Sequence, residues 1–141
     1  MKKKIYDKPN SEPNFTNQNK IGDMPEWNLS DLYSSPKAQE IDRDLKKVQN
    51  LCHAFAIKYK NNLLKLSASE MLDCLKAQEK INGLMGRLMS YASLRYYKKT
   101  SDNSRTKFLS DIQDKITEFS SKLIFFPIEF NKLEDDHLNN M

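Results

Sequence analysis

Large apolar residues recur at helical spacing along three stretches of the chain. The members of the three stretches are Ala38, Ile41, Leu45, Val48, Cys52, Phe55 and Tyr59; Met71, Leu75, Ile81, Met85, Leu88 and Ala92; and Phe108, Ile112, Ile116, Phe119, Leu123, Phe126 and Phe130. Residues that recur mostly three or four positions apart lie on one face of an α-helix. The pattern therefore predicts an all-α fold of long amphipathic helices, and short polar loops between them predict antiparallel neighbours.

Residues at the ends of these stretches have the side chains that helix ends prefer. Ser35 followed by Pro36 predicts the start of the first helix, since proline at the first helical position costs no hydrogen bond. The Asn61-Asn62 pair predicts its end. Residues 67–70, Ser-Ala-Ser-Glu, form a capping box for the second helix, and residues 100–102 supply caps for the third. Pro127 predicts a kink or an end near the close of the third helix.

Two glycines, Gly83 and Gly86, fall inside the second predicted helix. Each costs about 1 kcal/mol relative to alanine in a helix interior. Together with Ser90 and Ala92 they predict that another helix approaches closely at this point. A phosphate-binding glycine loop is not expected, because no strand precedes these residues.

The first 26 residues differ from the rest of the chain. Residues 1–26 are polar and rich in Asn, Lys and Pro, with few large apolar groups. Such a segment cannot bury enough surface to offset the entropy of ordering it, so we expect a disordered tail. Residues 27–141 are then expected to form one helical domain segment, which suits the length of the chain.

Charge and hydropathy limit the partners that the chain is expected to have. The 23 Lys and Arg residues against 19 Asp and Glu leave a net charge of +4, with both signs interspersed. The basic run at residues 95–99 is typical of a helix end, where cations complement the helix dipole, so nucleic acid is not expected as a partner. No apolar run approaches the length of a membrane span, and no apolar stretch follows the basic N-terminus. We therefore expect a cytoplasmic protein without membrane contact.

Cysteine and histidine are too few for a recognisable metal site. Cys52 and Cys74 have no metal-ligand spacing and are expected to be buried thiols in a reducing compartment. His53 has no second His or Cys four residues away, whereas zinc needs three or four convergent ligands. Residues 134–137 contain a single Glu-x-x-His, and a di-metal bundle site needs two of these.

Acidic side chains offer no catalytic pair. Asp42 and Asp44, and likewise Asp111 and Asp114, are expected to lie on solvated helix surfaces beside lysines. The nucleophile elbow, the phosphate-binding loop and the His-Glu-x-x-His zinc helix are all missing from the sequence. No catalytic, cofactor-binding or metal-binding residue is therefore predicted in this chain.

The order of several short segments nevertheless resembles the N-terminal region of oligoendopeptidase F, a relative of thimet oligopeptidase among the zinc metallopeptidases. Residues 27–33, Trp-Asn-Leu-Ser-Asp-Leu-Tyr, resemble the opening that these enzymes carry before their first long helix. Residues 91–97 and 100–102 are similar to a helix end and the turn after it, and residues 125–130 resemble the stretch before the next helices. Lys99 departs from the family, which often has an acid there.

The resemblance covers residues 27 to about 135 and implies a helical segment of a larger peptidase lobe. In the family, a His-Glu-x-x-His helix and a downstream Glu hold the zinc, in the C-terminal half of a longer chain that is not present here. The resemblance therefore implies a segment that helps wall the channel for short peptides, with the C-terminal catalytic portion as its partner in cis or in trans. The alternative is a self-sufficient helical protein-interaction module.

These two interpretations differ in what they expect of apolar residues beside the main stripes. The residues concerned are Leu51, Leu72, Leu109, Ile124 and Phe125. Three helices that meet in one seam cannot bury all of them, and soluble monomers rarely expose contiguous apolar patches. A segment of a larger peptidase is expected to leave such residues bare, whereas a self-sufficient module is expected to cover them.

Overall fold

The computed structural model describes residues 28–133 and 139, and all the regular secondary structure in this part of the chain is helical. The elements, in order, are α1 (Gln39–Tyr59), the 3-10 helix η1 (Leu63–Lys65), α2 (Ala68–Lys98), α3 (Asn103–Ser121) and α4 (Phe125–Phe130). The predicted all-α class is confirmed. The tail at residues 1–26, Trp27 and the acidic residues 134–137 lie outside the described residues.

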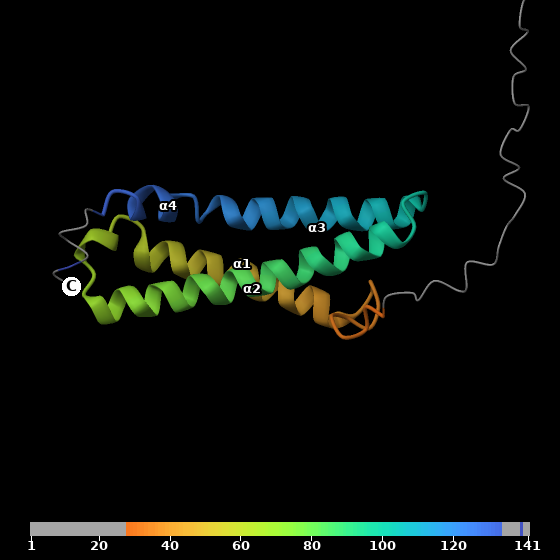
Figure 1. Cartoon of the computed structure of the whole chain (residues 1–141), viewed down its shortest axis with the longest axis horizontal. Helices are drawn as coiled ribbons and strands as arrows, with labels where there is room; N and C mark the ends of the chain where they lie inside the picture. The colour runs from red at the N-terminus through yellow and green to blue at the C-terminus, as the bar shows by residue number, and fades with distance from the viewer. Residues whose placement is uncertain (1–27, 134–138, 140–141) are drawn as a thin grey trace, which may run out of the picture.

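The three long helices lie side by side along the longest axis of the molecule (Figure 1). The chain runs along α1 towards the end where α4 lies, returns along α2 and runs back along α3. Helix α2 packs against both α1 and α3, and α4 packs against η1. The hydrophobic core therefore forms between the long helices, and α4 with η1 closes one end of it.

Most positions of the three apolar stripes are buried in this core. The buried hydrophobic residues include Ile41, Leu45, Val48, Cys52, Phe55, Tyr59, Met71, Ile81, Leu88, Ala92, Ile112, Phe119 and Leu123. Leu75 is an exception, since 41% of its surface is exposed. Tyr33, from the turn before α1, joins the core at 2% exposure and packs its ring edge-on against Tyr91.

The first helix begins at Gln39, so the predicted start at Pro36 is wrong. Ala38 has an extended backbone, with ψ at 133°, and makes no side-chain capping bond. Pro36 lies instead in a turn that the Ala38 N–H closes by donating to the Ser35 carbonyl at 3.1 Å. This turn leaves the preceding segment free to fold back over α1, and that is how Tyr33 enters the core.

The other predicted helix ends are found close to where the sequence placed them. The Ser67 side chain accepts from the Glu70 N–H, while the Glu70 carboxylate accepts from the Ser67 N–H at 2.8 Å, which completes the capping box. Asp102 accepts from the Ser104 N–H at 2.9 Å at the start of α3. Asn61, just after α1, adopts a left-handed φ of 63°, a conformation that Asn tolerates better than most residues.

The third apolar stripe forms two helices, and Pro127 explains the break between them. In a continuous helix the residue 127 N–H would donate to the Leu123 carbonyl, but proline has no N–H and its ring would clash with that carbonyl. The Leu123 carbonyl accepts from the Phe126 N–H instead, at 3.0 Å. Pro127 itself lies in the first turn of α4, where a missing N–H leaves no helical bond unmade.

The prediction that Gly83 and Gly86 allow close helix packing is wrong. Both residues are exposed, and a Cβ atom built on either would meet nothing within 4 Å. Residues two positions apart lie about 200° apart around a helix. Because Ile81 and Leu88 face the core, the two glycines are turned to the opposite side of α2.

Candidate functional site

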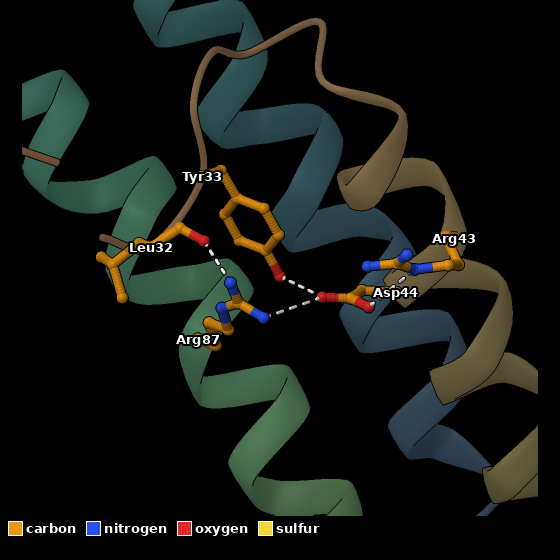
Figure 2. A network of polar contacts seen from close by, with 5 residues as sticks. All are labelled: Leu32, Tyr33, Arg43, Asp44 and Arg87. Atoms are coloured by element: carbon orange, nitrogen blue, oxygen red, sulfur yellow. Dashed lines mark hydrogen bonds and ion pairs between the residues drawn. The ribbon is translucent and has the colours of Figure 1, made fainter. Parts of the chain in front are cut away.

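A buried carboxylate, Asp44, is the centre of a polar network between the turn before α1 and the first two long helices. Asp44 is only 4% exposed, although it lies on α1 among charged neighbours. The Tyr33 hydroxyl donates to its Oδ2 atom at 2.8 Å (Figure 2). The prediction that Asp44 lies on a solvated helix surface is therefore wrong, because Tyr33 folds back from the turn and covers it.

Arg87 of α2 is the second partner of this carboxylate. Its Nη1 atom lies 3.5 Å from Asp44 Oδ2, and its Nη2 atom donates to the Leu32 carbonyl (Figure 2). The guanidinium also lies over the Tyr33 ring, with 4.5 Å between its carbon and the ring centroid. Arg43 approaches the other carboxylate oxygen at 3.8 Å, but its side chain is 71% exposed. Arg87 thus binds the turn, α1 and α2 to one another.

Burial is the main cause that raises the pKa of the Tyr33 phenol, and the hydrogen bond to Asp44 raises it further. The phenol therefore keeps its proton and acts as a donor to the carboxylate. A donor of this kind, together with a guanidinium, satisfies a carboxylate that would otherwise be costly to bury. The arrangement holds the turn in place.

The positions of Asp44 and Arg87 relative to the apolar stripes are a signal in the sequence from which this network could have been predicted. Asp44 lies three residues after Ile41 and four before Val48, so it falls on the edge of the apolar stripe. Arg87 lies directly before Leu88, a member of the second stripe. Charged residues at the edge of two facing stripes are candidates for a buried pair, whereas Asp42, Asp111 and Asp114 are exposed as predicted.

An open pocket of about 410 Å³ lies next to the network. Ser30 and Ser34 line it from the turn, Arg95 and Lys98 from the last turns of α2, and Arg105 from the first turns of α3. The pocket exists because the turn, the end of one helix and the start of the next meet there. Its charged lining residues are all cations.

The arginines of this pocket are held by their own contacts. Arg105 donates from Nη1 to the Arg95 carbonyl at 3.0 Å, and its Nε atom lies 3.4 Å from Asp102 Oδ2. The Arg95 guanidinium lies over the Phe108 ring at 5.4 Å. The basic run at residues 95–99 therefore does more than complement the helix dipole, because two of its members line a pocket.

Of the residues considered for metal or nucleophilic chemistry, His53 and the two cysteines lie in the part of the chain that the structure describes, whereas residues 134–137 do not. His53 is exposed on α1, while Cys52 and Cys74 are completely buried. Among the described residues, no group of three His, Cys, Asp or Glu side chains is placed to hold a metal ion. Burial raises the pKa of the Cys74 thiol to about 11 and also raises that of Cys52. Both thiols are therefore protonated at neutral pH and are weak nucleophiles.

Raising the pH through the range from about 9 to about 11 is expected to destabilise the fold. The folded protein keeps the Cys74 proton up to about pH 11, whereas an exposed thiol in the unfolded chain loses it near 9. The folded state thus binds more protons in this window, and the free energy of unfolding falls as the pH rises. Urea unfolding across the window measures this fall. Cys74→Ala should make it shallower, and an unchanged slope would contradict the assignment to this thiol.

No family model matches the chain, and no curated protein or solved structure shows significant similarity to it. None of the helices in the described part of the chain is both long enough and apolar enough to cross a bilayer.

Proposed function

We propose that this chain is the N-terminal helical segment of an oligoendopeptidase F-like zinc peptidase. In this proposal it supplies no catalytic residue, packs against the C-terminal catalytic portion, and helps wall the channel that admits short peptides. The partner is either the continuation of the same polypeptide or a separate chain. Support comes from the resemblance in residues 27–135 and from the distribution of exposed apolar side chains.

The observation that carries the proposal is a set of exposed apolar side chains on elements at one end of the helices. It consists of six exposed side chains, here called the apolar end: Ile57, Leu64, Leu72, Leu75, Ile124 and Ile128. They belong to the last turns of α1, to η1, to the first turns of α2, and to the α3–α4 junction with α4, which all lie at the same end of the molecule (Figure 1). Several exposed large apolar side chains at one end of a molecule are a feature that another protein or domain could cover.

The residues expected to be left bare divide into two groups. Leu72 and Ile124 are exposed, at 52% and 59%, and both belong to the apolar end. Leu51, Leu109 and Phe125 are partly buried against the core instead. The long helices therefore cover more of their apolar surface than expected, and six of the seven exposed large apolar side chains among the described residues belong to the apolar end; the seventh is Tyr97.

The alternative, a self-sufficient helical interaction module, is supported by the continuity of the core. Buried residues from the turn, α1, η1, α2 and α3 form one cluster without any partner. A genomic neighbour that encodes His-Glu-x-x-His in frame would favour the peptidase segment. A discrete, stable monomer without such a neighbour would favour the module.

Sedimentation and dye binding of the full 141-residue chain test the proposal. We expect self-association at micromolar concentration and strong binding of a hydrophobic dye, because the apolar end is bare. The double variant Leu72→Gln/Ile124→Gln should reduce both. Tyr97→Gln is the matched control, since Tyr97 is 66% exposed but lies near the other end of α2.

The partner is tested by adding the catalytic portion of an oligoendopeptidase F, which carries the His-Glu-x-x-His helix, in trans. The proposal expects this portion to suppress dye binding by the wild-type chain. It should leave the already weaker dye binding of the Leu72→Gln/Ile124→Gln variant unchanged. A compact monomer that binds no dye would reject the proposal in favour of the self-sufficient module.

A further inference from the structure

The pocket between the turn, the end of α2 and the start of α3 is lined by positively charged side chains. Its charged lining residues are Arg95, Lys98 and Arg105, and no acidic side chain lines it among the described residues. The Asp102 carboxylate contacts Arg105 from outside the lining, with 3.4 Å between Oδ2 and Nε. A concave site whose charged lining residues are all cations has a positive electrostatic potential, which attracts anions.

The cations are also arranged to act together. Arg95 and Lys98 are three residues apart, so they project from the same face of α2. Arg105 approaches from α3, where the Asp102 carboxylate and the Arg95 carbonyl hold its guanidinium. The site therefore presents positive charge from two helices towards one space, and contacts hold the guanidinium groups of Arg95 and Arg105 in place.

The opposite wall of the pocket is fixed as well. It is the turn before α1, which the Tyr33–Asp44 hydrogen bond and the Arg87–Leu32 bond attach to α1 and α2. Ser30 and Ser34 belong to this wall. Hydroxyls in a restrained turn add hydrogen-bond donors that need little reorganisation when a ligand arrives.

We propose that this pocket binds the phosphate group of a small phosphate monoester. A monoester phosphate carries a charge of about −1.5 to −2 near neutral pH and has three acceptor oxygens, which suits several cations better than a single carboxylate does. Guanidinium groups bind such oxygens in a bidentate manner. Neither this ligand nor this site depends on the peptidase proposal.

The volume indicates that the ligand is larger than phosphate alone. At about 410 Å³ the pocket falls in the range of about 300–1,000 Å³ that is usual for small-molecule sites. Tyr91 and Leu29 also line it and offer apolar surface beside the cations. The organic part of the monoester is expected to contact these two side chains.

Calorimetric titration of the full chain with phenyl phosphate, at fixed ionic strength, tests the site. We expect saturable binding, with inorganic phosphate and benzoate each several-fold weaker. Arg95→Gln should weaken phenyl phosphate binding by about tenfold or more, since a hydrogen bond to a charged group contributes about 1.5–3 kcal/mol. Lys98→Gln, at an exposed position that can be changed without disturbing the core, should weaken it several-fold.

Lys99→Gln is the matched control, because it removes the same charge from the next residue, which does not line the pocket. Its affinity should remain within about twofold of the wild type, and melting curves should show that all variants are folded. Absence of saturable binding overturns the proposal. So does equal weakening by Lys98→Gln and Lys99→Gln, which would mean diffuse attraction. Equal affinity for inorganic phosphate and phenyl phosphate rejects the monoester.

Discussion

Replacing Phe119 by alanine is expected to lower the free energy of unfolding by about 3–5 kcal/mol. Phe119 is only 6% exposed and belongs to the core cluster that α3 shares with α1 and α2. Its loss removes buried apolar surface and leaves a cavity that long helices cannot close without shifting along their whole contact. Leu45→Ala, at 5% exposure on α1, is expected to cost about 2–5 kcal/mol for the same reason.

Urea unfolding followed by circular dichroism measures these losses. Leu72→Ala is the control for Leu45→Ala, because it makes the same change on a helix at a residue that is 52% exposed. It should change the free energy of unfolding by less than about 1 kcal/mol. Equal losses at Leu45 and Leu72 would mean that the apolar stripes do not form the core.

The second large effect is expected at Arg87. Substituting Arg87 by methionine keeps much of the side-chain volume but leaves the buried Asp44 carboxylate with Tyr33 as its principal partner. Removing one member of a fully buried ion pair costs about 3–5 kcal/mol. Because the Arg87 side chain is 42% exposed, the expected loss is smaller, about 2 kcal/mol.

Arg43 provides a control with the same side chain and the same carboxylate. Arg43 is 71% exposed and lies 3.8 Å from Asp44, so Arg43→Met should cost less than about 0.5 kcal/mol. Thermal or urea unfolding of both variants at equal salt makes the comparison. If the two losses were the same, the Arg87–Asp44 contact would contribute no more than a surface ion pair.

Much of the fold could be predicted from the sequence because its helices are long and their apolar stripes regular. The capping box of Ser67 and Glu70 could also be predicted, because its hydrogen bonds join residues only three positions apart. The break near Pro127 could be predicted because proline lacks the backbone N–H that a helix needs. The start of α1 was misplaced because Ser35 and Pro36 have good local reasons to begin a helix. The turn that forms there instead is stabilised by Tyr33 in the core, a tertiary contact that local preferences do not contain.

Much less of the candidate sites could be predicted from the sequence. Asp44 and Arg87 are 43 residues apart, and each alone looks like an ordinary charged residue of a helix surface. The basic run at residues 95–99 was visible, but its meaning depends on Arg105 and on the turn that holds Ser30 and Ser34. A pocket assembled from three separate segments has no signature in any one of them.

The contact between Asn61 and Glu129 also has a consequence for how the chain folds as it is synthesised. The Asn61 N–H donates to the Glu129 carboxylate at 2.7 Å, and 68 residues separate the two. The ribosome must therefore synthesise α2, α3 and most of α4 before this hydrogen bond between the α1–α2 connection and α4 can form. The α1–α2 hairpin has to hold its own register through that interval. Until then, the connection after α1 depends on the burial of Leu63 in the core and on local hydrogen bonds such as the one from the Asn62 N–H to the Tyr59 carbonyl.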